Sequence, residues 1–174
     1  MAMVQYGLWP NCTNKCDFCL LDDRVYKTEN ERLHILKLVK ENIAAINWAD
    51  KFSDGISLLG GEVFYTESDA VKQSFLDLIN LIIEVIFTQS DRSILSVVSN
   101  GIYEPDILLI PVLDLLKNKH ALNRFNLNFS YDLKYRFHTE EARLLCLENI
   151  RKFNERYNCK VNVQMILTQN LINE

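Results

Sequence analysis

Short hydrophobic runs alternate with longer amphipathic segments along the whole chain. Runs rich in β-branched and aromatic residues are typical of buried strands, and apolar residues three or four positions apart indicate helices. The pattern therefore predicts repeated β-strand and α-helix units. The predicted strands are Val4 to Leu8, Ile56 to Leu59, Ile94 to Val98, Phe125 to Ser130 and Val161 to Leu167.

The segments between these strands carry apolar faces at helical spacing. The first helix is expected to begin near Thr28, because this residue is a good N-cap and Glu31 follows three positions later. Pro111 interrupts an apolar stretch and is expected to start or kink the third helix. The predicted apolar faces are Ile35, Val39, Ile43 and Ile46; Val71, Phe75, Leu78 and Ile82; and, after His138, Cys146, Ile150, Phe153 and Tyr157.

This order of elements favours an α/β fold with a mainly parallel sheet, because parallel neighbours need crossovers of this length. A closed barrel of eight such units usually needs about 250 residues, and the chain has 174. We therefore expect a single domain, residues 1–174, that forms an open partial (β/α) barrel with a curved sheet of about five strands. Functional side chains are expected at the carboxyl ends of the strands.

Composition narrows the classes of function. Hydrophobic residues make up 48% of the chain, which is enough for one buried core, and the formal net charge is -4. A negative charge without a run of basic residues argues against nucleic acid as a partner. The sequence has neither an apolar stretch long enough to span a bilayer nor a secretory leader, so we expect a cytoplasmic protein without a membrane partner.

Three of the five cysteines, Cys12, Cys16 and Cys19, fall within eight residues. This spacing suits a metal better than a disulfide framework. Thiolates are the usual ligands of iron–sulfur clusters, and three of them would leave one iron of a four-iron cluster open. A zinc site is the alternative, but it normally requires a fourth cysteine or histidine, and His34 is poorly placed for that role. Cys146 is expected to be a buried small hydrophobe.

Polar residues follow the second, third and fourth predicted strands. Glycine permits a close approach to the backbone, and a carboxylate can accept hydrogen bonds from an ammonium group. The same residue types also dominate ordinary turns and caps, so the polar residues after the third and fourth strands could have a structural role only. These residues are Gly60, Gly61 and Glu62, then Ser99 and Asn100, then Ser130 and Asp132.

The CxxxCxxC spacing, with Phe18 just before the last cysteine, and the later Gly-Gly-Glu resemble the radical S-adenosylmethionine (SAM) family. The resemblance implies a [4Fe-4S] cluster on Cys12, Cys16 and Cys19, with SAM chelating the open iron. It also implies SAM-binding roles for Phe18, Gly60, Gly61, Glu62, Ser99, Asn100, Ser130 and Asp132.

Members of this family cleave SAM reductively to methionine and a 5'-deoxyadenosyl radical, which abstracts hydrogen from a substrate. The resemblance therefore implies an electron donor such as a flavodoxin or ferredoxin, and it slightly favours a peptide or protein substrate. No general acid or base can be named. The family core usually has six units, so we expect that downstream residues are missing or that a partner completes the sheet. A non-catalytic module that only binds the cluster and SAM is the main alternative.

Overall fold

The computed structural model describes residues 3–14, 16, 26–49, 54–131, 137–157 and 162–164. Its centre is a five-stranded sheet in the order β1-β2-β3-β4-β5, in which every neighbouring pair is parallel. The strands are β1 (Val4–Gly7), β2 (Gly55–Leu59), β3 (Ile94–Ser99), β4 (Phe125–Ser130) and β5 (Asn162–Gln164). The predicted α/β class and parallel sheet are therefore confirmed.

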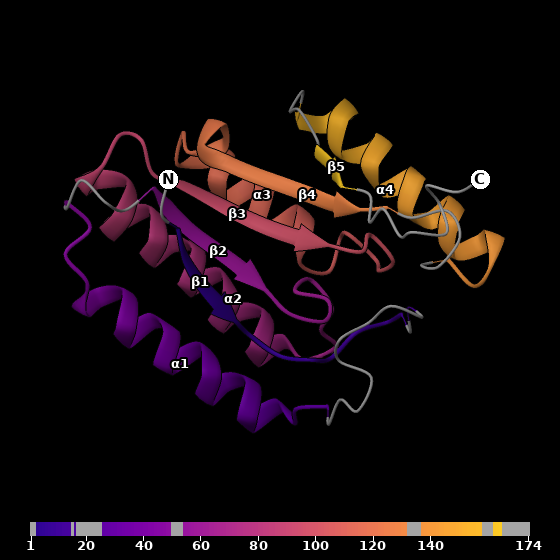
Figure 1. The fold of residues 1–174 in the computed structure, drawn as a ribbon, viewed down its shortest axis with the longest axis horizontal. Helices are drawn as coiled ribbons and strands as arrows, with labels where there is room; N and C mark the ends of the chain where they lie inside the picture. The colour runs from indigo at the N-terminus through magenta and orange to yellow at the C-terminus, as the bar shows by residue number, and fades with distance from the viewer. Residues whose placement is uncertain are drawn as a thin grey trace, which may run out of the picture.

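Four α-helices connect the strands within the described residues. They are α1 (Glu29–Ala45), α2 (Asp69–Ile82), α3 (Leu109–Asn118) and α4 (Glu140–Tyr157). A π-helical turn, η1 (Ile83–Phe87), extends α2, and a 3-10 turn, η2 (Leu122–Arg124), precedes β4. Because the strands follow their sequence order and each crossover has the same hand, the helices line one face of the sheet. The strands all point toward one edge, on the right in Figure 1.

Local sequence signals account for most helix boundaries. The Thr28 side chain accepts a hydrogen bond from the Glu31 backbone, and the Glu31 side chain accepts one from the Thr28 N–H, so the predicted capping box is present. Pro111 lies in the first turn of α3, where a missing N–H has no helical partner to lose. The predicted start or kink at this proline is therefore a start.

The buried face of α1 differs from the predicted one. Leu36, Val39 and Ile43 are buried, whereas the predicted Ile35 and Ile46 are only half-buried. Arg32 completes the buried face one turn earlier. The predicted face was rotated because the spacing of the apolar residues alone allowed either Ile35 or Leu36, and an arginine is not counted in an apolar pattern.

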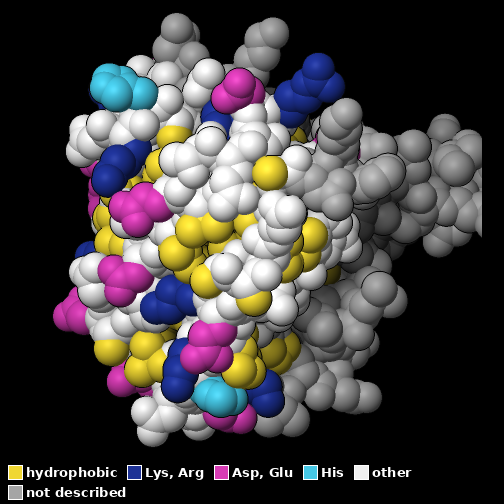
Figure 2. Space-filling view, turned by 90° about the vertical axis from the view of Figure 1, so that its left-hand side faces the viewer, with side chains coloured by type: hydrophobic (Ala, Val, Ile, Leu, Met, Phe, Trp, Pro, Cys, Tyr) yellow, Lys and Arg dark blue, Asp and Glu magenta, His cyan; other side chains and the backbone are white. Residues whose placement is uncertain are grey.

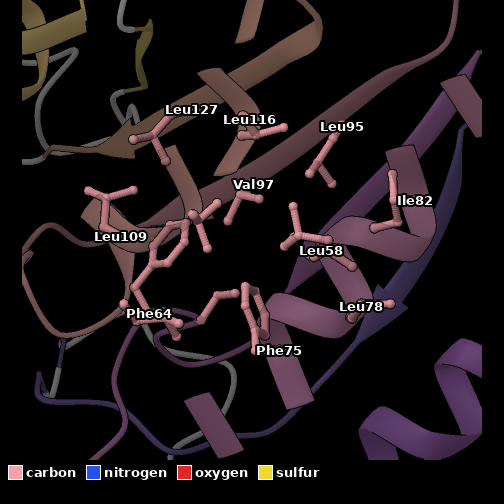
Figure 3. Packing of buried hydrophobic residues seen from close by; sticks show 14 of the residues in the cluster. Leu58, Phe64, Phe75, Leu78, Ile82, Leu95, Val97, Leu109, Leu116 and Leu127 are labelled. Carbon is pink, nitrogen blue, oxygen red and sulfur yellow. The ribbon is translucent and has the colours of Figure 1, made fainter. Parts of the chain in front are cut away.

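The core fills the space between the sheet and the helices. Side chains from β2, β3 and β4 point toward α2 and α3, as Figure 3 shows for Leu58, Val97 and Leu127 against Phe75 and Leu109. In α4, Cys146, Phe153 and Tyr157 are buried as predicted, while Ile150 is half-buried and Asn149 is buried beside them. The predicted burial of Cys146 is thus confirmed, since the residue is 0% exposed.

The opposite face of the sheet carries a row of neutral polar side chains. In the strand register Ser57 pairs with Ser96, and Ser96 pairs with Asn126, so these three side chains form a row across the sheet. Asn128 Nδ2 donates a hydrogen bond of 3.0 Å to Ser96 Oγ. Ser57, Ser96 and Asn128 are all buried, and alternation along each strand separates this polar face from the apolar core.

Candidate site at the carboxyl ends of the strands

The loop after β1 continues alongside the segment that follows β2. The Leu8 N–H donates to the Leu59 carbonyl, the Gly61 N–H to Trp9 and the Glu62 N–H to Asn11, at 2.9, 2.8 and 2.7 Å. Trp9 Nε1 also donates to the Glu62 carbonyl at 3.1 Å. These bonds extend the parallel pairing beyond the strands. They hold the start of the cysteine loop against Gly60, Gly61 and Glu62, two segments that sequence analysis placed in one site.

Close backbone packing explains the two glycines. A Cβ atom on Gly60 would lie 2.7 Å from the Trp9 carbonyl oxygen. A Cβ on Gly61 would lie 2.5 Å from the Asn11 carbonyl oxygen and would also clash with that of Pro10. We expected these glycines to admit a ligand. Here the group that approaches them is the chain's own cysteine loop, and the predicted SAM contact stays a prediction.

Amide groups surround the two described cysteines of the motif. The Asn14 backbone N–H lies 3.4 Å from Cys12 Sγ, and Asn14 Nδ2 lies 3.3 Å from Cys16 Sγ. Asn100 Nδ2, from the end of β3, lies 3.2 Å from Cys12 Sγ. Both sulfur atoms therefore lie within hydrogen-bond distance of Asn14. The other predicted residues of this loop, Phe18 and Cys19, lie outside the described residues.

Glu62 is a buried carboxylate at the centre of the site, with 0% of its surface exposed. Its Oε1 accepts a hydrogen bond from the Phe64 N–H at 3.0 Å. Its Oε2 accepts one from the Asn100 N–H at 2.7 Å and lies 3.2 Å from Ser99 Oγ. Charge-assisted hydrogen bonds of this kind are what make a buried carboxylate tolerable. Glu62 thus fastens the end of β2 to the end of β3.

The predicted pair at the end of β3 belongs to this same network. Ser99 is 1% and Asn100 2% exposed. Ser99 Oγ lies 3.0 Å from the Tyr103 hydroxyl. Burial, followed by the nearby Glu62 charge, raises the pKa of Tyr103 well above its ordinary value, so this phenol stays protonated. The hydrogen bonds of Ser99 and Asn100 thus reach both Glu62 and Cys12, and their predicted SAM contact stays a prediction.

The fourth predicted position is partly described. Ser130 ends β4, is buried and pairs in register with Gln164 of β5. It lies on the polar face of the sheet, next to the edge where the other site residues gather. Within the described residues, no hydrogen bond joins Ser130 to the cysteine loop, and its predicted SAM contact stays a prediction. Asp132 lies outside the described residues.

Several residues that hold this loop in place were not predicted from the sequence. The Asn11 side chain forms two hydrogen bonds with the Lys27 backbone, at 2.9 and 3.1 Å. Thr13 Oγ1 donates to the Ile102 carbonyl at 2.6 Å. Asn14 itself stands between two predicted ligands, and its position there was an available signal. Tyr103 gave none, because nothing in its local sequence indicates burial beside a carboxylate.

Within the described residues, no group of three or more histidine, cysteine, aspartate and glutamate side chains is placed to hold a metal ion. The described residues include Cys12 and Cys16 but not the third predicted ligand, Cys19. His34, His120 and His138 are exposed. No helix in the described part of the chain has the length and hydrophobicity to cross a membrane.

Charged side chains of both signs lie at the amino ends of the strands, away from the candidate site. Figure 2 shows the side at the amino ends of the strands, where basic and acidic side chains are interspersed. The candidate site lies at the other edge of the sheet.

No protein-family model matches the chain, and no curated protein matches it. Function is therefore inferred from the residues and their geometry.

Proposed function

We propose that this protein is a radical SAM enzyme whose [4Fe-4S] cluster is held by Cys12, Cys16 and Cys19. The observation that carries the proposal is the joining of three segments at one edge of the sheet. The cysteine loop pairs with Gly60-Gly61-Glu62, and both contact Ser99-Asn100. These segments are far apart in the sequence, and the resemblance in sequence requires them to form one site.

The chemistry around the sulfur atoms suits this cluster. Asn14 and Asn100 direct N–H groups at Cys12 and Cys16. Such donors stabilise thiolates and tune the reduction potential of iron–sulfur clusters. A structural zinc site would use the same thiolates but needs a fourth protein ligand.

We place SAM over the cysteine loop, against the backbone after β2. Gly60 is exposed and Gly61 half-buried, so their backbone is accessible to a ligand. The Glu62 carboxylate is already bound to Phe64 and Asn100. Its role in this proposal is therefore to position Asn100, and through it Cys12. With cluster and SAM bound, the site supplies one-electron cleavage of SAM to methionine and a 5'-deoxyadenosyl radical.

The sheet is proposed to curve as a partial (β/α) barrel, with its polar face toward the substrate. That face carries hydroxyl and amide groups from Ser57, Ser96 and Asn128. Neutral hydrogen-bonding groups suit the backbone of a peptide, which is the substrate class we favour. An external protein such as a flavodoxin or ferredoxin is the proposed electron donor.

Anaerobic reconstitution tests the proposal. Iron and sulfide are measured first, and 5'-deoxyadenosine is then measured after addition of SAM and a strong reductant. We expect about four irons per chain and formation of the nucleoside. A Cys16→Ala variant is expected to lose both. Cys146→Ala is the matched control, because it removes a thiol that is buried in the core and lies outside the cysteine motif.

Two other results would show that the proposal is wrong and would identify a different function. Cluster absorbance without any 5'-deoxyadenosine would identify a non-catalytic module that binds the cluster and SAM. Zinc in place of iron after reconstitution with both metals would identify a structural zinc protein.

A further inference from the structure

A cavity of about 390 Å³ lies beside Cys12, and its lining includes Tyr26, Glu29, Arg32, Tyr65 and Glu67. It is bordered by the first turn of α1 and by the segment between β2 and α2. Its volume is in the range of pockets that bind small molecules. Gly60 and Gly61 are not among its lining residues, so this cavity is separate from the backbone to which SAM is assigned.

Arg32 is an incompletely partnered cation in the lining of this cavity. The residue is 6% exposed, and its guanidinium lies 4.3 Å above the Trp9 ring. One nitrogen, Nη2, donates to the Tyr65 carbonyl at 2.8 Å. Nε is buried without a hydrogen-bond partner. Burial lowers the pKa of Arg32, and the nearby Glu29 charge offsets part of this effect without an ion pair within the described residues. A buried charge is normally paired, so an anion is the missing partner.

The carboxylates that line the cavity indicate which class of anionic ligand it can bind. Glu29 and Glu67 are both exposed and line the same space as Arg32. Glu67 is held in position by the Tyr65 hydroxyl, which donates to its Oε1 at 3.0 Å. A phosphate would gain one cation but face two carboxylates. A ligand that carries an ammonium group next to its carboxylate satisfies both signs of charge.

We propose that this cavity binds a free α-amino acid. Its carboxylate pairs with Arg32, and its ammonium group pairs with Glu29 or Glu67. Its side chain lies between Tyr26 and Tyr65, whose rings give the walls an aromatic character. Because Cys12 also lines the cavity and the Tyr26 hydroxyl donates to the Cys12 carbonyl at 3.0 Å, the bound amino acid stabilises the cysteine loop. This binding requires neither cluster nor SAM.

Binding is measured by calorimetry on the full chain in the absence of SAM. The probes are L-alanine, L-leucine and L-phenylalanine, each compared with the analogue that lacks its amino group and with the amine that lacks its carboxylate. Inorganic phosphate is the fourth probe. We expect at least one amino acid to bind ten or more times more tightly than both of its analogues and than phosphate. If none of the three binds, or if phosphate binds as tightly, the proposal is wrong.

Substitutions locate the binding. Arg32→Met keeps an apolar stem over Trp9 and is expected to weaken binding at least tenfold. The double variant Glu29→Gln, Glu67→Gln changes only exposed side chains and decides the question if Arg32→Met does not fold. It is expected to remove the preference for the amino acid over its deaminated analogue. Lys37→Gln, on the exposed side of α1, is the control with unchanged affinity. Wild-type affinity in the variants would overturn the proposal.

Discussion

The carboxylate of Glu62 accepts a hydrogen bond of 2.7 Å from the backbone N–H of Asn100, a residue 38 positions further along the chain. The side chain of the same asparagine donates to Cys12 Sγ. One buried carboxylate is therefore linked, through one residue, to a sulfur atom of the cysteine loop.

Replacement of Glu62 by glutamine should destabilise the fold. An amide has one acceptor oxygen, so the NH₂ group of glutamine would face the N–H of either Phe64 or Asn100, both of which now bind the carboxylate. We expect the free energy of unfolding to fall by about 2–4 kcal/mol, measured by denaturant unfolding. Glu67→Gln changes an exposed carboxylate and should cost less than about 1 kcal/mol. Equal losses in the two variants would contradict this role of Glu62.

A methyl group at Gly61 should displace the cysteine loop. Its position, 2.5 Å from the Asn11 carbonyl oxygen, forces the loop out of its pairing with the segment after β2. We expect Gly61→Ala to retain the helical circular dichroism of the wild type but to bind less than half of the iron. Gly7→Ala is the matched control, because a Cβ there meets no atom within 4 Å. Full iron content in Gly61→Ala would show that the pairing is not needed.

Loss of an N–H donor should lower the reduction potential of the proposed cluster. Hydrogen bonds to the sulfur ligands favour the reduced, more negative state. Asn100→Ala removes the donor 3.2 Å from Cys12 Sγ. A hydrogen bond that is stronger by about 0.5–1.5 kcal/mol in the reduced state corresponds to about 20–60 mV for one electron. Redox titration followed by electron paramagnetic resonance measures the shift, with Asn118→Ala at the exposed end of α3 as control. An unchanged or raised potential would exclude this role.

The capping box of α1 predicts a dependence of stability on pH. The backbone hydrogen bond from Thr28, and then the bond from its side chain, lower the pKa of Glu31 below its ordinary value. A lowered folded-state pKa adds stability above the pKa of the unfolded chain, and that stability is lost as the pH falls through the folded-state pKa. Wild type should therefore be more stable than Glu31→Ala at pH 7, and the difference should shrink below about pH 4.5. A difference independent of pH would contradict the charged cap.

Local patterns were sufficient to predict β1 to β4, the capping box and the buried face of α2. Each depends on residues that are close in sequence, such as Thr28 and Glu31. The predicted strand from Val161 to Leu167 lies partly outside the described residues, within which β5 covers Asn162–Gln164. The same patterns could not choose between Ile35 and Leu36 on α1, because both lie at helical spacing and the choice depends on burial of Arg32 against Trp9. Tertiary packing made that choice.

The candidate site was predictable as a set of segments but not as a network. Cysteines, glycines and strand-ending polar residues could be named because parallel strands bring their carboxyl ends together. The binding of the Glu62 carboxylate to Phe64 and Asn100, and the clash that forbids a side chain at Gly61, depend on where the loops cross. No pattern within one segment carries that information.

The most direct test of the central claim is electron paramagnetic resonance of the reconstituted, reduced protein before and after SAM is added. If Cys12, Cys16 and Cys19 hold a four-iron cluster with one open iron, the spectrum of the reduced cluster should change when SAM binds, and the signal should be absent from Cys16→Ala. A reduced cluster whose spectrum is identical with and without saturating SAM, or a wild-type protein that forms no four-iron cluster, would contradict the account.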